Sequence, residues 1–192
     1  MTDQEWLEFM TTVGKLKRTV RTGWKLKGIR QPENVSDHMF RMGVLSFFID
    51  NSVKIGEVTH CIDKNKVLKM SLIHDLAEAI VGDITPHCGI DPNDKFKLEL
   101  DAMNKMVDML RKSEKSEAAD EIMSLWQEYN QRSSPESILC KDFDCFEMIL
   151  QASEYEQEQS ADLQDFFDST SGKFKTDLVA KWVKLLHDKR NK

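Results

Sequence analysis

The sequence contains few residues that interrupt helices. It has 8 glycines and 4 prolines in 192 residues, and both types disfavour a helix interior, Gly through its conformational freedom and Pro through its missing N–H donor. Apolar residues recur at helical spacing, first in Trp6, Phe9, Met10, Val13 and Leu16, and no strand alternation stands out. The sequence therefore predicts an all-α protein, and its length suits a single domain over residues 1–192.

The apolar periodicity places further helices between identifiable breaks. Gly23, Gly28 and Pro32 mark a polar loop, and Gly82 ends another helical pattern. Pro135, between Ser134 and Glu136, is typical of a first helical turn. After the first helix, a second is predicted from residues 34–36 to about residue 53, and a third over residues 64–80. Two more helical patterns follow residue 92, another helix begins at residue 135, and the last helix covers about residues 174–189. The acidic, Gln-rich residues 154–168 are left unassigned.

Charge and composition exclude several classes of function. The net charge of -6, without a basic tail, argues against binding to a nucleic-acid polymer. No apolar run approaches the roughly 20 residues that span a bilayer, and the acidic, polar start of the chain does not resemble a signal peptide. The four cysteines form no CxxC pair, so they are expected to be reduced thiols. These features predict a soluble cytoplasmic protein without a membrane partner.

Two histidines and two aspartates form the pattern that most directly indicates chemistry. His74 and Asp75 are adjacent, His38 lies upstream in Ser36-Asp37-His38, and Asp144 lies downstream in Lys141-Asp142-Phe143-Asp144. Each of these residues alone is more often a capped, core-edge or solvated side chain than a ligand. Together, two imidazoles and two carboxylates make a mixed nitrogen and oxygen shell that suits a water-activating divalent ion.

Glu78 is a further candidate because of its spacing from His74. On a helix over residues 64–80, positions four apart share one face, whereas Asp75 points about 100° away from His74 but can still reach one ion at the helix edge. Glu78 taken alone is an ordinary surface residue of a helix. Beside His74 it becomes a candidate acid or base, or a ligand of a second metal.

Several runs together resemble the HD-domain metal-dependent phosphohydrolases, and more narrowly the HD-domain 5'-deoxynucleotidases. The runs are Thr22-Gly23-Trp24, Pro32-Glu33-Asn34-Val35-Ser36-Asp37-His38-Met39, His74-Asp75-Leu76-Ala77-Glu78, Val81-Gly82-Asp83-Ile84, Lys141-Asp142-Phe143-Asp144-Cys145-Phe146-Glu147-Met148 and Gln151-Ala152-Ser153-Glu154-Tyr155. They lie in a core of about residues 34–155 and just before it. The resemblance implies a single HD-domain helical bundle with its metal site in the core between helices.

The resemblance also implies an activity and roles for residues. A metal-dependent phosphomonoester hydrolase of this kind, usually a homodimer, converts deoxynucleoside 5'-monophosphates to deoxynucleosides and phosphate. By the family pattern, the first divalent cation (Mn, Co or Mg) is held by His38, His74, Asp75 and Asp144. Glu78 and Asp83 are then the catalytic residues, and with the Ile84 carbonyl they are also candidate ligands of a second metal.

The chain departs from the bacterial pattern at the residues expected to bind the substrate. Trp24 is either an aromatic residue packed on the core or, by the resemblance, a wall that leaves no room for a 2'-hydroxyl. The Arg that precedes this Trp in bacterial relatives is replaced by Gly23. Phosphate then needs another cation, and the basic stretch of residues 15–30 is either a solvated surface or the anion site; its candidates are Arg21, Lys25, Lys27 and Arg30.

Two alternatives to a 5'-deoxynucleotidase stay open. The chain could be an HD phosphohydrolase for another nucleotide, such as a ribonucleotide, a cyclic nucleotide or a modified nucleotide. It could also be a nucleotide-sensing protein that binds a metal without turnover. The complete set of ligands and the acidic helper Glu78 favour catalysis over both a sensor and a purely structural helical domain.

Overall fold

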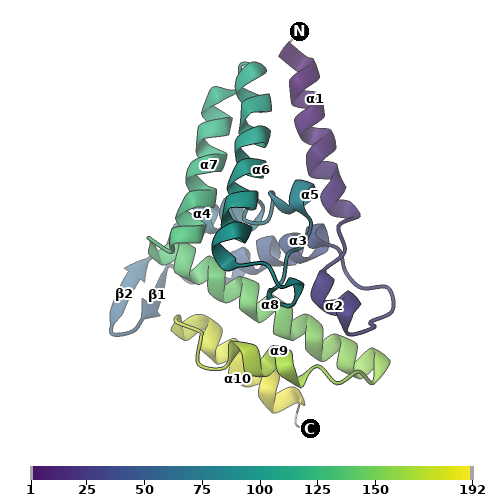
Figure 1. Cartoon of the computed structure of the whole chain (residues 1–192). Helices are drawn as coiled ribbons and strands as arrows, with labels where there is room; N and C mark the ends of the chain where they lie inside the picture. Colours follow the sequence, from purple (N-terminus) through teal and green to yellow (C-terminus); the bar gives the residue numbers. More distant parts are fainter. Residues whose placement is uncertain (1, 191–192) are drawn as a thin grey trace. The chain divides into compact units, whose positions relative to one another are not determined.

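The computed structural model describes residues 2–190, and the elements in that range are mostly helices (Figure 1). The helices are α1 (Thr2–Val13), α2 (Thr22–Leu26), α3 (Val35–Leu45), α4 (Lys64–Ser71), α5 (Glu78–Val81), α6 (Pro92–Lys112), α7 (Ser116–Gln131), α8 (Pro135–Gln159), α9 (Gln164–Thr170) and α10 (Asp177–Arg190), with 3-10 turns η1 (Gly14–Lys17), η2 (Ser46–Phe48) and η3 (Pro86–Cys88). The predicted all-α class is confirmed.

Short polar side chains start several helices where the sequence predicts a start. The Asp63 carboxylate accepts hydrogen bonds from two backbone N–H groups in the first turn of α4. Ser134 caps α8 through a reciprocal pair of bonds with Ser137, and Pro135 occupies the first turn. These caps satisfy backbone donors that have no partner inside the helix. The helix start predicted at Pro135 is therefore confirmed.

The chain divides into two compact units. The first comprises the chain up to Met39 and Ile73–Gln127, and the second comprises Phe40–Leu72 and the chain from Glu128 onward. In the first unit, α1 packs along α6 and also contacts α5 (Figure 1). Its hydrophobic core is closely filled; the fully buried members are Val35, Met103, Met106, Val107 and Ala119.

Helix α8 organises the second unit. Helices α4, α9 and α10 all pack against it (Figure 1). The Asp142 carboxylate on α8 accepts hydrogen bonds from the backbone N–H groups of Lys175 and Thr176 and from the Thr176 hydroxyl. These contacts fix the start of α10 against α8. Burial raises the pKa of Asp142, and the bonds from Thr176 and Lys175 oppose that rise.

A small β-hairpin departs from the sequence prediction. Strands β1 (Ser52–Ile55) and β2 (Val58–Cys61) pair antiparallel, with Val53 opposite His60 and Ile55 opposite Val58. Gly56, at a φ of +59°, makes the turn that joins them. The predicted helix from residues 34–36 to about residue 53 is therefore too long, because α3 and η2 end at Phe48. Gly56 between short apolar segments was the available signal.

The predicted helix over residues 64–80 is interrupted. Helix α4 ends at Ser71 and α5 begins only at Glu78, with turns between them. The backbone N–H groups of Leu76, Glu78 and Ala79 bond to carbonyls three residues back, which is a tighter winding than an α-helix. The prediction that His74 and Glu78 share one face of a regular helix is therefore wrong. No Gly or Pro marks the break, so periodicity alone could not reveal it.

Two further segments are now assigned. Residues 154–168, which the sequence left open, contain the last turns of α8 and the start of α9. The last helix was predicted over about 174–189, and α10 covers Asp177–Arg190. Over residues 2–190, no helix is both long and apolar enough to cross a bilayer.

Candidate active site

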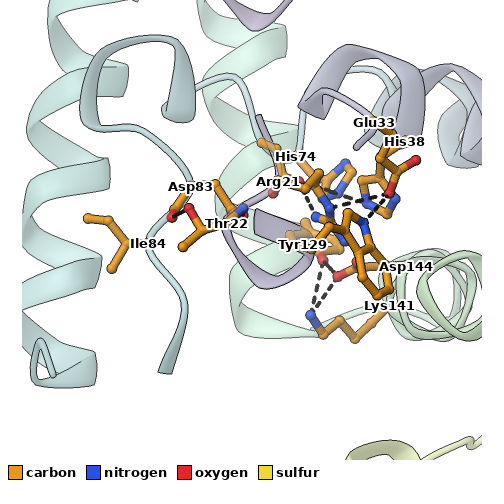
Figure 2. A network of polar contacts seen from close by, with 12 residues as sticks. Arg21, Thr22, Glu33, His38, His74, Asp83, Ile84, Tyr129, Lys141 and Asp144 are labelled. Carbon is orange, nitrogen blue, oxygen red and sulfur yellow. Dashed lines mark hydrogen bonds and ion pairs between the residues drawn. The ribbon is translucent and has the colours of Figure 1, made fainter. Parts of the chain in front are cut away.

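Two buried histidines lie side by side in the first unit. His38 comes from the first turns of α3, and His74 comes from the turns between α4 and α5. Their ring centroids are 5.5 Å apart with the planes inclined by 65°, and a ring nitrogen of one lies within 4.8 Å of a ring nitrogen of the other (Figure 2). The two imidazoles are thus close enough to bind one ion.

Asp75 adds a carboxylate oxygen to the histidine pair. Its Oδ2 atom lies 3.1 Å from His74 Nε2 and 3.9 Å from His38 Nε2. The structure therefore brings together three of the four predicted metal ligands in one unit. Two imidazole nitrogens and a carboxylate oxygen form a donor set that fits a divalent transition metal or Mg²⁺.

Asp144, the fourth predicted ligand, belongs to the second unit. It lies on α8, where its Oδ2 accepts hydrogen bonds from the Tyr129 hydroxyl and the Lys141 ammonium, both at 2.6 Å (Figure 2). The carboxylate is mostly buried, with 16% of the side chain exposed. A carboxylate oxygen that already contacts an ammonium group is a suitable partner for a cation.

Glu78 is a buried acid at the beginning of α5. The residue is 4% exposed, and among the residues that the structure describes its Oε2 atom has no hydrogen-bond partner. Burial raises the pKa of the Glu78 carboxyl well above its usual value, and the negative charges of Asp75 and Asp83 raise it further, against smaller opposing effects of Arg21 and Lys95. Without a metal nearby, Glu78 therefore retains its proton more readily than an ordinary glutamate.

Asp83 and Ile84 are engaged in contacts within the protein. The Asp83 carboxylate accepts a bond from the Thr22 backbone N–H, and the Asp83 carbonyl accepts one from the Thr22 hydroxyl at 2.7 Å (Figure 2). The Ile84 carbonyl accepts a bond from Lys95 Nζ at 2.7 Å. Asp83 thus anchors the start of α2 beside the site, and a metal at the Ile84 carbonyl would have to displace Lys95.

Trp24 is fully packed and held by a carboxylate. It is 1% exposed, and its indole N–H donates to Glu33 Oε1 at 2.8 Å. Glu33 also lies 3.7 Å from Arg21 Nε. Glu33 belongs to one of the matching sequence runs, but no role was predicted for it. Its place in the same run as His38 was the only sign of a role in the sequence. The structure shows that Glu33 fixes both Trp24 and Arg21.

Arg21 is the cation that the structure places at the histidine site. Its guanidinium lies 4.0 Å from Asp75 Oδ2, and 13% of the side chain is exposed. Lys25, another of the four predicted phosphate-binding candidates, is exposed on α2, and no described contact joins its side chain to the site. A mostly buried guanidinium is a good partner for a phosphoryl group.

Comparisons with known proteins show the family to which the chain belongs. The family model described as HD domain matches residues 13–185. A protein named 5'-deoxynucleotidase HDDC2 from Dictyostelium discoideum is 48% identical over 174 residues, covering 88% of this chain and 90% of the relative. Its human namesake is 39% identical over 187 residues, covering 96% and 86%. A crystal structure from Pyrococcus horikoshii OT3 has a TM-score of 0.71 at 30% identity, covering 95% and 96%.

The raised pKa of Glu78 predicts how stability depends on pH. A carboxyl whose pKa is higher in the folded state costs stability as the pH rises above its unfolded pKa, because ionisation then opposes folding. The variant Glu78→Gln should therefore melt a few degrees above the wild type at neutral pH in EDTA, since about 1 kcal/mol corresponds to about 2–4 °C for a chain of this size. The difference should shrink toward pH 4. Thermal melts between pH 4 and pH 7 test this prediction, with Glu57→Gln at an exposed position as control. A difference in melting temperature that widens toward low pH would contradict the prediction.

Proposed function

The chain belongs to the HD-domain family, and on this basis we propose that it is a metal-dependent 5'-deoxynucleotidase. It is a phosphomonoester hydrolase that converts deoxynucleoside 5'-monophosphates to deoxynucleosides and phosphate. The observation that carries this proposal is the cluster of His38, His74 and Asp75 in the first unit. Relatives named as 5'-deoxynucleotidases, 39–48% identical over most of the chain, support the reaction. In this proposal residues 1–192 form one HD domain, of which the two compact units are parts.

The metal ligands in this proposal are His38, His74, Asp75 and Asp144. The first three lie together in one unit. Mn, Co and Mg all suit this mixture of nitrogen and oxygen donors, and Mn and Co suit the two imidazoles better than Mg does. When bound, the ion would polarise a water molecule and offset negative charge on the phosphoryl oxygens.

The similarity of Lys141-Asp142-Phe143-Asp144 to the family pattern supports Asp144 as the fourth ligand. Its carboxylate already faces a cation, because its Oδ2 atom lies 2.6 Å from Lys141 Nζ. The ion would then replace Lys141 as the cation that the Asp144 carboxylate faces.

Arg21 and Glu78 are the protein groups proposed to act on the substrate. Arg21 would bind the phosphate in place of the cation that is missing at Gly23, because its guanidinium lies 4.0 Å from Asp75 Oδ2. Glu78 would hold a proton near the leaving 5'-oxygen, since its raised pKa keeps it protonated more readily than an ordinary glutamate. Asp83 keeps α2 in position through Thr22. The bond from Lys95 to the Ile84 carbonyl favours this proton-carrying role over a second metal ion.

Trp24 is proposed to exclude ribonucleotides. A buried ring held by Glu33 cannot move aside for an added hydroxyl, so a 2'-hydroxyl would clash or lose its hydrogen-bond partners. The sugar preference then depends on the rigidity of the ring as well as on its size. Glu33 supplies that rigidity.

An exposed apolar surface supports a homodimer. The residues are Phe40, Val44, Phe47 and Phe48 on α3 and η2, within the second unit, and the three phenylalanines are 65–74% exposed. Their spacing follows one face of a helix. A group of large exposed apolar side chains marks an association surface, and a second copy of this chain is the proposed partner.

The proposed location is the cytoplasm. All four cysteines are free thiols, which fits a reducing compartment.

Hydrolysis can be tested on metal-stripped protein supplied with Mn, Co or Mg. Phosphate release from deoxynucleoside 5'-monophosphates should require the metal, and His74→Ala and Asp144→Asn should each lower metal affinity and turnover at least about tenfold, because even outer-shell changes cost that much. The exposed His87→Ala is the matched control. No release with any metal from folded protein would refute the activity. Normal metal binding and turnover in Asp144→Asn would refute the fourth ligand alone.

The sugar preference can be tested with matched deoxy- and ribonucleotides. Glu33→Gln and Trp24→Phe should raise relative turnover of ribonucleoside 5'-monophosphates by about 10-fold, since a single steric or polar contact is worth about 1–3 kcal/mol of discrimination. The measurement is the ratio of kcat/KM for the two sugars. Trp6→Phe, an exposed Trp on α1, is the control. An unchanged ratio in both variants would show that another residue excludes the 2'-hydroxyl.

The dimer can be tested by light scattering after size-exclusion chromatography. The wild type should run at twice its chain mass, and Phe47→Asp should run at the mass of one chain, because a charge in an apolar interface is costly to bury. Val58→Asp, at an exposed apolar position on β2, should leave the dimer intact. A wild type that is monomeric over the whole concentration range would refute the proposal.

A further inference from the structure

A pocket with no assigned role lies wholly within the second unit. Its volume is about 550 Å³, and its lining comes from the β-hairpin turn, from α8 and the turn before it, and from the segment that leads into α10. The lining residues are Ile55, Gly56, Arg132, Ile138, Lys141, Asp142, Lys173, Phe174 and Lys175. This volume is typical of a small-molecule site.

The charge of this pocket is strongly positive. Arg132, Lys141, Lys173 and Lys175 contribute four cations in a chain whose net charge is -6. The only carboxylate in the lining, Asp142, is already used by the backbone N–H groups of Lys175 and Thr176 and by the Thr176 hydroxyl. Among the described residues, Arg132, Lys173 and Lys175 take part in no ion pair within 4.0 Å. Three cations without such an ion pair, gathered beside Lys141, attract an anion.

The rest of the lining is apolar. Ile55, Ile138 and Phe174 provide aliphatic and aromatic walls, and all three are partly buried. A free inorganic anion would satisfy the cations but leave these walls in contact with water. A ligand that joins a polyanionic group to a planar or apolar body would satisfy both parts of the lining.

We propose that this pocket binds a small polyanion with an aromatic body, of the class of nucleoside triphosphates. Four cations match the charge of a triphosphate group, and Phe174 with the two isoleucines receives the base. Lys173 and Lys175, on the exposed rim, contact the phosphates first. The site consists of residues other than those of the proposed active centre, so it is a binding site for an effector and not for the substrate.

Lys141 connects this pocket to Asp144. It lines the pocket, and its Nζ atom lies 2.6 Å from Asp144 Oδ2 (Figure 2). A polyanion in the pocket competes with Asp144 for this ammonium group. In this respect the inference rests on the proposed function. If Asp144 binds the catalytic metal, release of Lys141 from Asp144 leaves the Asp144 carboxylate available to the metal and raises turnover. Coupling between two such sites is commonly worth at least about fivefold.

Binding is tested first, by calorimetric titration of ATP into the full-length, metal-free protein in EDTA. ATP should bind, inorganic tripolyphosphate should bind more weakly, and adenosine should not bind. The double variant Lys173→Glu/Lys175→Glu should lose at least about tenfold in affinity, because two attractive charges become repulsive. Lys184→Glu, an exposed position on α10 outside the pocket, should bind like the wild type. His74→Ala should also bind normally.

Two results would overturn the site. One is the absence of ATP binding up to millimolar concentration in folded wild-type protein. The other is ATP binding that His74→Ala removes and Lys173→Glu/Lys175→Glu retains, because ATP would then occupy the proposed active centre. Thermal melts of every variant show whether a loss of binding reflects a loss of folding.

Turnover is tested separately, with Mn²⁺ in excess of total ATP. ATP should stimulate phosphate release from a deoxynucleoside 5'-monophosphate about fivefold in the wild type and in Lys184→Glu. Lys173→Glu/Lys175→Glu should keep the basal rate and lose the stimulation. ATP binding without stimulation would refute the coupling through Lys141. ATP binding to a protein that shows no turnover under any condition would refute the proposed function and leave the pocket supported.

Discussion

The Asp75 carboxylate beside two buried imidazoles is the interaction on which the site depends. Its Oδ2 atom is within 4.0 Å of His74, His38 and Arg21. The Asp75 side chain is only 19% exposed, and a carboxylate withdrawn from water is stabilised by cationic or donating partners. Arg21 is positioned by Glu33, and the start of α2 is tied to Asp83 through Thr22. A change in any of these contacts therefore alters the charge balance around Asp75.

Helix α8 performs three tasks with carboxylates two or three residues apart. Asp142 fixes the start of α10, Asp144 faces Tyr129 and Lys141, and Glu147 receives Arg41. A rigid helix of 25 residues keeps these groups in constant relation. Lys141 belongs to both the Asp144 contact and the cationic pocket. The proposed regulation requires only that this one side chain exchange partners, without a rearrangement of the backbone.

The sequence predictions succeeded where the physical signal is local and failed where it is not. Ser134 and Pro135 determine the start of α8 through their own backbone chemistry, so that start was predictable. The break between α4 and α5 has no Gly or Pro, and the tighter bonding of residues 76–79 is visible only in the folded chain. The β-hairpin was missed because each strand is only four residues long, too short for a clear alternation.

The sequence by itself determined the helical class and the set of chemically competent residues, because breaker frequency, apolar spacing and residue type are properties of the chain. Only the tertiary structure decided which residues meet. It placed Arg21 rather than Lys25 near Asp75, gave Trp24 a carboxylate partner in Glu33, and buried Glu78 without a hydrogen bond to its Oε2. It also gathered Arg132, Lys141, Lys173 and Lys175 around one pocket. Such contacts join residues distant in sequence, and their energies depend on burial and distance, which no local pattern encodes.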